Sequence, residues 1–177
     1  TGNPIVFKPA TLTPLGAVEF VRAFEEAGLP PGVLNLVTGS ADPVGRAIVD
    51  HPGVKALSFT GGVPAGREVY ERSAKLLKRV ELELGGKNPQ IVMDDADLDL
   101  AVEGILFGAF GTAGQRCTAT SRLLLHEGIY DPMMEKLLRR TAALKVGNPL
   151  IRLWTWARSR ALRKRRPSFV TSISVWT

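Results

Sequence analysis

The sequence predicts an α/β fold, in which a parallel sheet with flanking helices is followed by the start of a second α/β domain. Three observations support this prediction. Short apolar runs alternate with segments of helical periodicity, Gly and Pro separate many of these segments, and the connections are short. Alternation of this kind is typical of parallel sheets whose faces are covered by helices. In such sheets, ligands bind beyond the carboxyl ends of the strands.

The first half of the chain opens with a strand predicted at residues 5–8, an apolar run that ends before Pro9. Thr13-Pro14 predicts an N-cap and the first turn of a helix. That helix ends at Gly28, a natural C-terminal stop. Its predicted apolar face consists of Ala17, Phe20, Val21, Phe24 and Ala27.

Two more strand–helix steps and a further strand follow before residue 86. Strands are predicted at residues 33–37, 55–60 and 79–84, and helices at residues 43–49 and 64–77. Several polar or glycine residues fall at or just past the strand ends, where a ligand would bind: Lys8, Gly39, Gly61-Gly62 and Glu83.

The spacing of the predicted strands and helices changes after Gly85-Gly86. A strand is predicted at residues 90–93, a helix at 96–110, a glycine turn leading to Cys117, a strand at 122–126 and a helix at 130–144. The apolar face of the first of these helices is predicted to be Leu98, Ala101, Val102, Ile105, Leu106 and Ala109.

The formal net charge of +6 is concentrated at the end of the chain. Residues 151–177 hold seven of the 23 Lys and Arg, all three Trp and no acid, which leaves 16 basic against 17 acidic residues in 1–150. The basic cluster 163–166 lies in this tail, and neither the helical nor the strand period is evident there. We therefore expect residues 151–177 to lie outside the fold of the preceding chain.

The composition narrows the class of protein. A hydrophobic content of 45% fits a globular chain that buries a core. No apolar run approaches the roughly 18 residues that span a bilayer, and no leader pattern precedes the first strand. The single cysteine cannot form an internal disulfide, which favours a reducing compartment. We expect a cytoplasmic protein with no membrane partner.

Cys117 and Glu83 are the residues best suited to covalent catalysis at sulfur. Cys117 follows a glycine turn and a neighbouring Arg116 that would favour the thiolate, and its own N–H could stabilise an oxyanion. Glu83 would be a general base whose pKa is raised by partial burial. The alternatives are a buried structural cysteine and a charge on an exposed strand edge.

Two further features suggest a phosphate-bearing ligand. Residues 59–66 form a glycine turn between a strand and a helix, where backbone N–H groups can approach phosphate. Lys8 could hold a ribose or a phosphate, or could be an ordinary solvated lysine. His51 and His126 are isolated, so no metal site is expected.

Taken together, these segments resemble the aldehyde dehydrogenase superfamily. The run 82–89 is similar to the family's glutamate signature, the run 110–119 is similar to its cysteine signature, and the two candidates Glu83 and Cys117 lie 34 residues apart. Segments 7–9, 28–35 and 59–62 match the cofactor domain in the same order. The resemblance runs from about residue 2 to residue 150.

The resemblance implies an NAD(P)-dependent oxidation of an aldehyde to a carboxylic acid through a thioester on Cys117, with Glu83 activating water. It implies a Rossmann-like cofactor domain over residues 1–86 and the start of the catalytic domain over 87–150, with 151–177 as a basic tail. The implied cofactor-binding residues are Lys8, Thr11, Phe59, Thr60, Gly61, Gly62, Gly66 and Leu84.

The sequence departs from the family pattern in two ways, which bear on the cofactor preference and on the activity of this chain. Thr11 stands where many NAD-preferring members have Glu, so tolerance of NADP is expected. Complete members are also far longer and form homo-oligomers, so this partial chain is expected to be weakly active or inactive. We interpret residues 151–177 as out-of-frame or artefactual sequence. The alternative function is a non-catalytic fragment whose basic tail binds nucleic acid.

Overall fold

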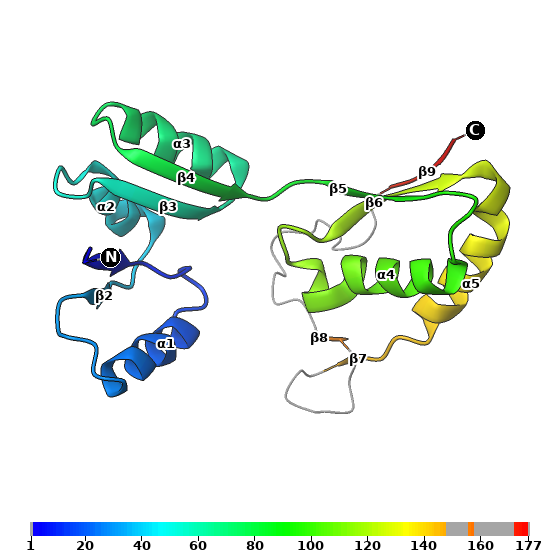
Figure 1. The fold of residues 1–177 in the computed structure, drawn as a ribbon, viewed down its shortest axis with the longest axis horizontal. Helices are drawn as coiled ribbons and strands as arrows, with labels where there is room; N and C mark the ends of the chain where they lie inside the picture. Colours follow the sequence, from blue (N-terminus) through cyan, green and yellow to red (C-terminus); the bar gives the residue numbers. More distant parts are fainter. Residues whose placement is uncertain (1, 148–155, 158–171, 177) are drawn as a thin grey trace. The chain divides into compact units, whose positions relative to one another are not determined.

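The computed structural model describes residues 2–147, 156–157 and 172–176, and it describes side chains for residues 2–147 (Figure 1). The chain forms two compact units, Thr1–Glu83 and Leu84–Thr177. Parallel strand pairs and helices occur in the described residues, which confirms the predicted α/β class. The predicted basic cluster 163–166 lies outside the described residues.

In the first unit, strand β1 (Ile5–Phe7) pairs in parallel with strand β2 (Leu34–Leu36), and helix α1 (Leu15–Glu26) connects them. The helix ends as expected at Gly28, whose φ of 86° is left-handed. The N–H of Gly28 donates to Glu25 O and that of Leu29 to Phe24 O, which is the Schellman arrangement. The β1–α1–β2 step therefore follows the sequence pattern.

Helix α1 differs from the prediction at its start and on its face. Thr13 was expected as the N-cap, but the helix begins after Pro14 and has no side-chain cap. Val21 is buried, whereas Phe20 and Phe24 are 53% and 41% exposed. The two rings instead meet edge to face, with centroids 5.0 Å apart, and Phe20 also contacts Phe7.

The rest of the first unit contains strands β3 (Ala56–Gly61) and β4 (Arg79–Leu84), which pair with each other. Helix α3 (Val63–Ala74) connects them, and Figure 1 shows it beside the β3–β4 ribbon. Helix α2 (Arg46–Asp50), preceded by a π-helical turn η1 (Ala41–Gly45), contacts α3. The predicted strand at residues 79–84 is confirmed with the same bounds.

The strands of the first unit form two separate pairs, β1–β2 and β3–β4. The sequence predicted one continuous parallel sheet, and hydrogen bonding between the two pairs would be needed to make it. Within the described residues, the predicted Rossmann-like sheet is therefore present only as its component strand pairs.

In the second unit, strands β5 (Asn88–Val92), β6 (Thr120–His126) and β9 (Ser172–Trp176) form a parallel sheet in the order β5-β6-β9. A small parallel pair, β7 (Val146–Gly147) and β8 (Trp156–Ala157), completes the described strands. Strand β9 was not predicted: we found no period in the tail, yet residues 172–176 pair along β6. Part of that tail therefore joins the second unit.

Helices α4 (Leu98–Phe110) and α5 (Tyr130–Ala142) pack with β5 and β6 to form the core of the second unit (Figure 1). Asp97 caps α4 by accepting hydrogen bonds from the N–H groups of Asp99 and Leu100. The predicted apolar face of α4 is confirmed, because its side chains are buried or packed against the core. The buried cluster is Val92, Val102, Ile105, Leu106, Leu123, Leu125, Ile129, Met133 and Leu137.

Two short 3-10 turns connect these elements: η2 (Gly111–Gly114) follows α4, and η3 (Glu127–Ile129) precedes α5. The first of them carries the chain from the end of α4 to Cys117. The core therefore fixes both ends of the segment that contains the candidate nucleophile, because α4 precedes this segment and β6 follows it directly.

Candidate functional site

Cys117 lies in a turn between η2 and β6, and its side chain is exposed. This exposure argues against the alternative of a buried structural cysteine. The N–H of Ala119 donates to Arg116 O at 3.1 Å and closes the turn. The approach to the turn is unusual, because Thr112, Ala113 and Gly114 all have positive φ, at 55°, 56° and 66°.

Asn88, the first residue of β5, holds this turn from the neighbouring strand. Its Nδ2 donates to Cys117 O at 2.5 Å and to Ala119 O at 3.2 Å. Asn88 belongs to the glutamate signature, but sequence reasoning gave it no role. The signal that could have found it is a side-chain amide donor two residues before the strand predicted at 90–93.

Arg116 ties the same turn to helix α4. Its Nη2 donates to Phe107 O at 2.9 Å, and its guanidinium carbon lies 4.5 Å from the centre of the Phe107 ring. The sequence predicted an electrostatic role for Arg116 beside the thiol. The contacts observed for its guanidinium are with Phe107, so its described role is to anchor the turn to α4.

Glu83 is the penultimate residue of β4, in the first unit. Side chains along β4 alternate between exposed and half-buried, and Glu83 is on the exposed side with Glu81, while Leu84 is half-buried. The burial expected for a general base is therefore not present at Glu83 in the described residues. Glu83 belongs to the first unit and Cys117 to the second.

Lys8 and Thr11 lie just beyond the carboxyl end of β1, where a ligand of a parallel sheet is expected. Lys8 is half-buried and donates from Nζ to Pro9 O at 3.1 Å. Thr11 is exposed and donates from Oγ1 to Gly39 O at 3.2 Å, which joins it to the segment after β2. Two of the predicted cofactor residues are thus neighbours at one edge of the β1–β2 pair.

The predicted glycine turn lies between β3 and α3. Gly62 precedes the helix, no side chain caps its first turn, and Pro64 lies in that turn. A Cβ on Gly61 would lie 2.5 Å from the Phe59 ring, so a side chain at this position would require that ring to move. Thr60 is exposed and Gly66 is buried in the helix. The predicted position of the turn before a helix N-terminus is thus observed, and the binding of an anion there stays a prediction.

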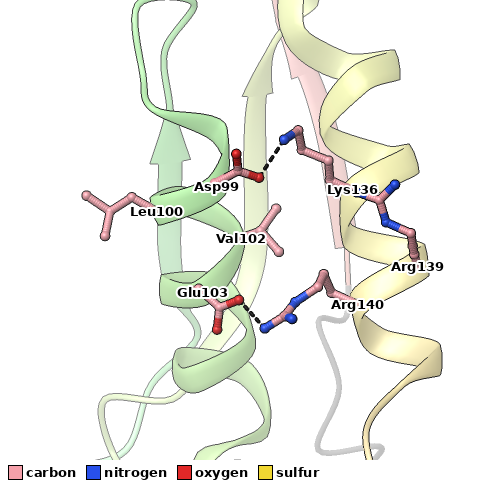
Figure 2. A pocket seen from close by; sticks show the side chains of 7 residues that line it. All are labelled: Asp99, Leu100, Val102, Glu103, Lys136, Arg139 and Arg140. Atoms are coloured by element: carbon pink, nitrogen blue, oxygen red, sulfur yellow. Dashed lines mark hydrogen bonds and ion pairs between the residues drawn. The ribbon is translucent and has the colours of Figure 1, made fainter.

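A separate pocket lies between α4 and α5, and Figure 2 shows its lining. Two ion pairs cross it, from Lys136 to Asp99 at 2.5 Å and from Arg140 to Glu103. The hydrogen bond from Lys136 holds the pKa of Asp99 below its ordinary value. The lining contains none of the predicted site residues; it consists of Asp99, Leu100, Val102, Glu103, Lys136, Arg139 and Arg140.

Among residues 2–147, 156–157 and 172–176, no three His, Cys, Asp or Glu side chains are grouped so that they could hold a metal ion. Within the same part of the chain, none of the helices has the length and apolar character needed to cross a membrane.

The two signature segments, with Glu83 and Cys117, lie in the order that the resemblance to the aldehyde dehydrogenase superfamily implies. A family model described as the aldehyde dehydrogenase family matches residues 1–156, and the chain belongs to this family. The match ends six residues beyond the limit at residue 150 that the motifs had suggested. The NAD(P)-dependent dehydrogenase family expected from the sequence is thereby confirmed.

Curated relatives from Bacillus subtilis agree with this assignment. The chain is 47% identical over 149 residues to an alpha-ketoglutaric semialdehyde dehydrogenase, and 47% identical over 155 residues to a 1-pyrroline-5-carboxylate dehydrogenase. Each alignment covers 84% of this chain and 30% of the relative. The chain therefore spans about 30% of the length of these curated relatives.

Solved structures show the same fold. An NADP-dependent enzyme from E. coli aligns with a TM-score of 0.80 and 47% identity, over 81% of this chain and 30% of its own. A betaine aldehyde dehydrogenase from Staphylococcus aureus, in complex with NAD+, aligns with a TM-score of 0.85 and 38% identity, over 89% of this chain and 31% of its own. Both cofactors thus occur among the homologues.

Proposed function

We propose that the protein oxidises an aldehyde to a carboxylic acid with NAD(P)+, using Cys117 as the nucleophile and Glu83 as the general base. The observation that carries the proposal is the exposed thiol of Cys117 in a turn held by side-chain hydrogen bonds of Asn88 and Arg116. Membership of the aldehyde dehydrogenase family supports it. Because the chain spans about 30% of its relatives' length, the proposal concerns the whole protein's activity.

In this mechanism, the Sγ of Cys117 attacks the carbonyl carbon of the aldehyde, and the N–H of Cys117 donates to the oxygen that becomes negative. Bound NAD(P)+ would supply the hydride acceptor; loss of a hydride from the former aldehyde carbon leaves the acyl group on Cys117 as a thioester. Glu83 then takes a proton from water, which attacks the thioester carbonyl. The acid leaves and the thiolate of Cys117 is restored.

The residues of the first unit fit a dinucleotide. The uncapped N-terminus of α3, approached through Gly61 and Gly62, offers N–H groups to a pyrophosphate. Lys8 and Thr11 lie at the carboxyl end of β1, where a ribose would be held. We propose contacts with the cofactor for these residues and for Phe59, Thr60, Gly66 and Leu84, within a Rossmann-like sheet.

Glu83 is exposed on β4, so we propose that it reaches its catalytic environment only when the whole protein surrounds it. We further propose that the whole protein is a homo-oligomer, as the resemblance implies for complete family members. We also propose that it lies in the cytoplasm, because the thiol of Cys117 requires a reducing environment for the proposed chemistry.

The experiment is a measurement of NAD(P)H formation by the purified protein with an aldehyde, using Cys117→Ala as the control. We expect formation of NAD(P)H that depends on Cys117. Aldehyde oxidation that persists in Cys117→Ala would contradict the proposal, because no other cysteine is present in the chain.

A further inference from the structure

The backbone on both sides of Cys117 is fixed by hydrogen bonds that come from different elements. The carbonyl of Arg116 and the N–H of Cys117 belong to one planar peptide unit. That unit is held because Arg116 O accepts from the N–H of Ala119. The next unit is held because Cys117 O accepts from Asn88 Nδ2. Both peptide planes at the Cα of Cys117 are therefore restrained.

Asn88 supplies what the backbone of β5 cannot supply at this point. The β5–β6 register pairs Asn88 with Thr120 and then shifts between Asn88 and Pro89. Pro89 has no N–H to donate, so the ladder is interrupted where the cysteine turn enters β6. The side-chain amide of Asn88 spans this interruption with two donated hydrogen bonds.

We propose that Asn88 is a positioning residue for Cys117, which sets the direction of its Sγ and its N–H. The inference rests on the proposed function, because it assigns Asn88 to the same reaction. Asn88 reaches the backbone of the turn and need not touch the substrate. Its effect on rate comes from geometry, since a displacement of about 1 Å in a reacting group costs about 100-fold in rate.

The chemistry of the amide dictates how substitutions should rank. Nδ2 of Asn88 carries two hydrogens, one for each of the carbonyls of Cys117 and Ala119. A serine offers one donor, an alanine offers none, and an aspartate places acceptor oxygens against two carbonyl oxygens. We therefore expect positioning of Cys117 to weaken in the order Asn, Ser, Ala, Asp.

A matched control lies two residues along the same strand. Gln90 Oε1 accepts a hydrogen bond from Thr120 Oγ1 at 3.2 Å, so Gln90→Ala also removes a side-chain bond between β5 and β6. That bond does not involve a carbonyl of the cysteine turn. A purely structural role for Asn88 predicts the same behaviour for the two alanine variants, whereas a positioning role predicts a difference.

The test combines hydrogen exchange with steady-state kinetics on the full chain. In Asn88→Ala we expect amide exchange at residues 117–119 to be about tenfold faster or more, with exchange in α5 unchanged, because the clamp of the turn is lost. We expect kcat to fall about 100-fold while KM for the cofactor stays within about twofold. Asn88→Ser should recover part of both, and Gln90→Ala should change neither.

The outcomes separate the two proposals. Exchange at residues 117–119 that is the same in Asn88→Ala and in the unaltered chain would overturn the positioning role, and this readout requires no turnover. Equal losses of kcat in Asn88→Ala and Gln90→Ala would also overturn it. Aldehyde oxidation that survives Cys117→Ala would instead overturn the proposed function, whatever the exchange at the turn shows.

Discussion

Gly108 of α4 lies against Thr120 of β6 so closely that a Cβ added to Gly108 would be 2.4 Å from Thr120 Oγ1 and 3.3 Å from Thr120 Cβ. The last turn of α4 can approach the start of β6 only because residue 108 has no side chain. Phe107, which anchors Arg116, is the neighbouring residue on the same turn. The close approach of α4 and β6 therefore fixes the positions of the two elements between which the cysteine turn lies.

We expect Gly108→Ala to lower the free energy of unfolding by about 1–3 kcal/mol, because the added methyl overpacks the contact with Thr120. Urea unfolding followed by circular dichroism measures this change. The control is Gly104→Ala on the same helix, whose Cβ would meet only Gln90 Nε2, at 3.4 Å. It should stabilise by up to about 1 kcal/mol through helix propensity. The packing argument would be contradicted if the free energy of unfolding of Gly108→Ala were equal to or higher than that of Gly104→Ala.

The pairing of Asp50 with Arg72 predicts an acid-sensitive contribution to the stability of the first unit. Arg72 Nε donates to Asp50 Oδ1 at 2.9 Å and its Nη2 donates to Oδ2, and these bonds lower the pKa of Asp50 below its ordinary 3.8. Because the folded-state pKa is lowered, the contribution is complete above the unfolded-state value. It is lost as the pH falls through the folded-state pKa.

The measurement is the unfolding midpoint of the unaltered chain and of Asp50→Asn, taken from about pH 6 to about pH 2. We expect the unaltered chain to be modestly more stable at neutral pH, with the difference disappearing below pH 3.8. Glu19→Gln is the matched control, because Glu19 is also exposed and paired with an arginine but sits within one helix turn of it. A constant difference across the pH range would exclude Asp50 titration as its cause.

Local patterns were sufficient where one segment determines its own structure. The alternation in Arg79–Leu84 predicted β4 with its observed bounds, and the apolar spacing from Leu98 predicted the buried face of α4. The left-handed stop at Gly28 followed from the absence of a Cβ. In each case the signal lies in residues adjacent in the chain.

Other features depend on contacts that no local pattern contains. Phe20 and Phe24 have helical core spacing, but spacing does not supply a partner surface, and both remain substantially exposed. The turn of Cys117 depends on Asn88, 29 residues earlier. The exposed position of Glu83 reflects which face of β4 is covered, and alternation along a strand does not specify that.

The uncharged side chain of Thr11 leads to a prediction about the relative affinity for NAD+ and NADP+. Thr11 is exposed beyond β1 and donates to Gly39 O, and it carries no charge to repel a 2′-phosphate. We expect Thr11→Glu to weaken NADP+ binding about tenfold or more and to leave NAD+ binding within about threefold, since a carboxylate repels the extra phosphate and accepts from a ribose hydroxyl. Isothermal titration calorimetry with each cofactor measures both effects.

Thr11→Gln is the control for this cofactor prediction, because it has the size of glutamate without its charge. It should weaken NADP+ binding much less than Thr11→Glu does. A loss of NADP+ binding that is equal in the two variants would assign the effect to size. A strong NAD+ preference of the unaltered chain would contradict the expectation that Thr11 tolerates NADP+.

Glu83 provides the sharpest separation of the two chemical steps. If Glu83 activates water, Glu83→Gln should still form the thioester on Cys117 but should hydrolyse it about 100-fold more slowly or worse. The acyl group would then accumulate, and intact-protein mass spectrometry after mixing with aldehyde and cofactor would detect it. Glu81→Gln is the matched control, because Glu81 lies on the same exposed side of β4. Accumulation in both variants, or in neither, would remove Glu83 from the hydrolytic step, whereas accumulation in Glu83→Gln alone would assign this carboxylate to it.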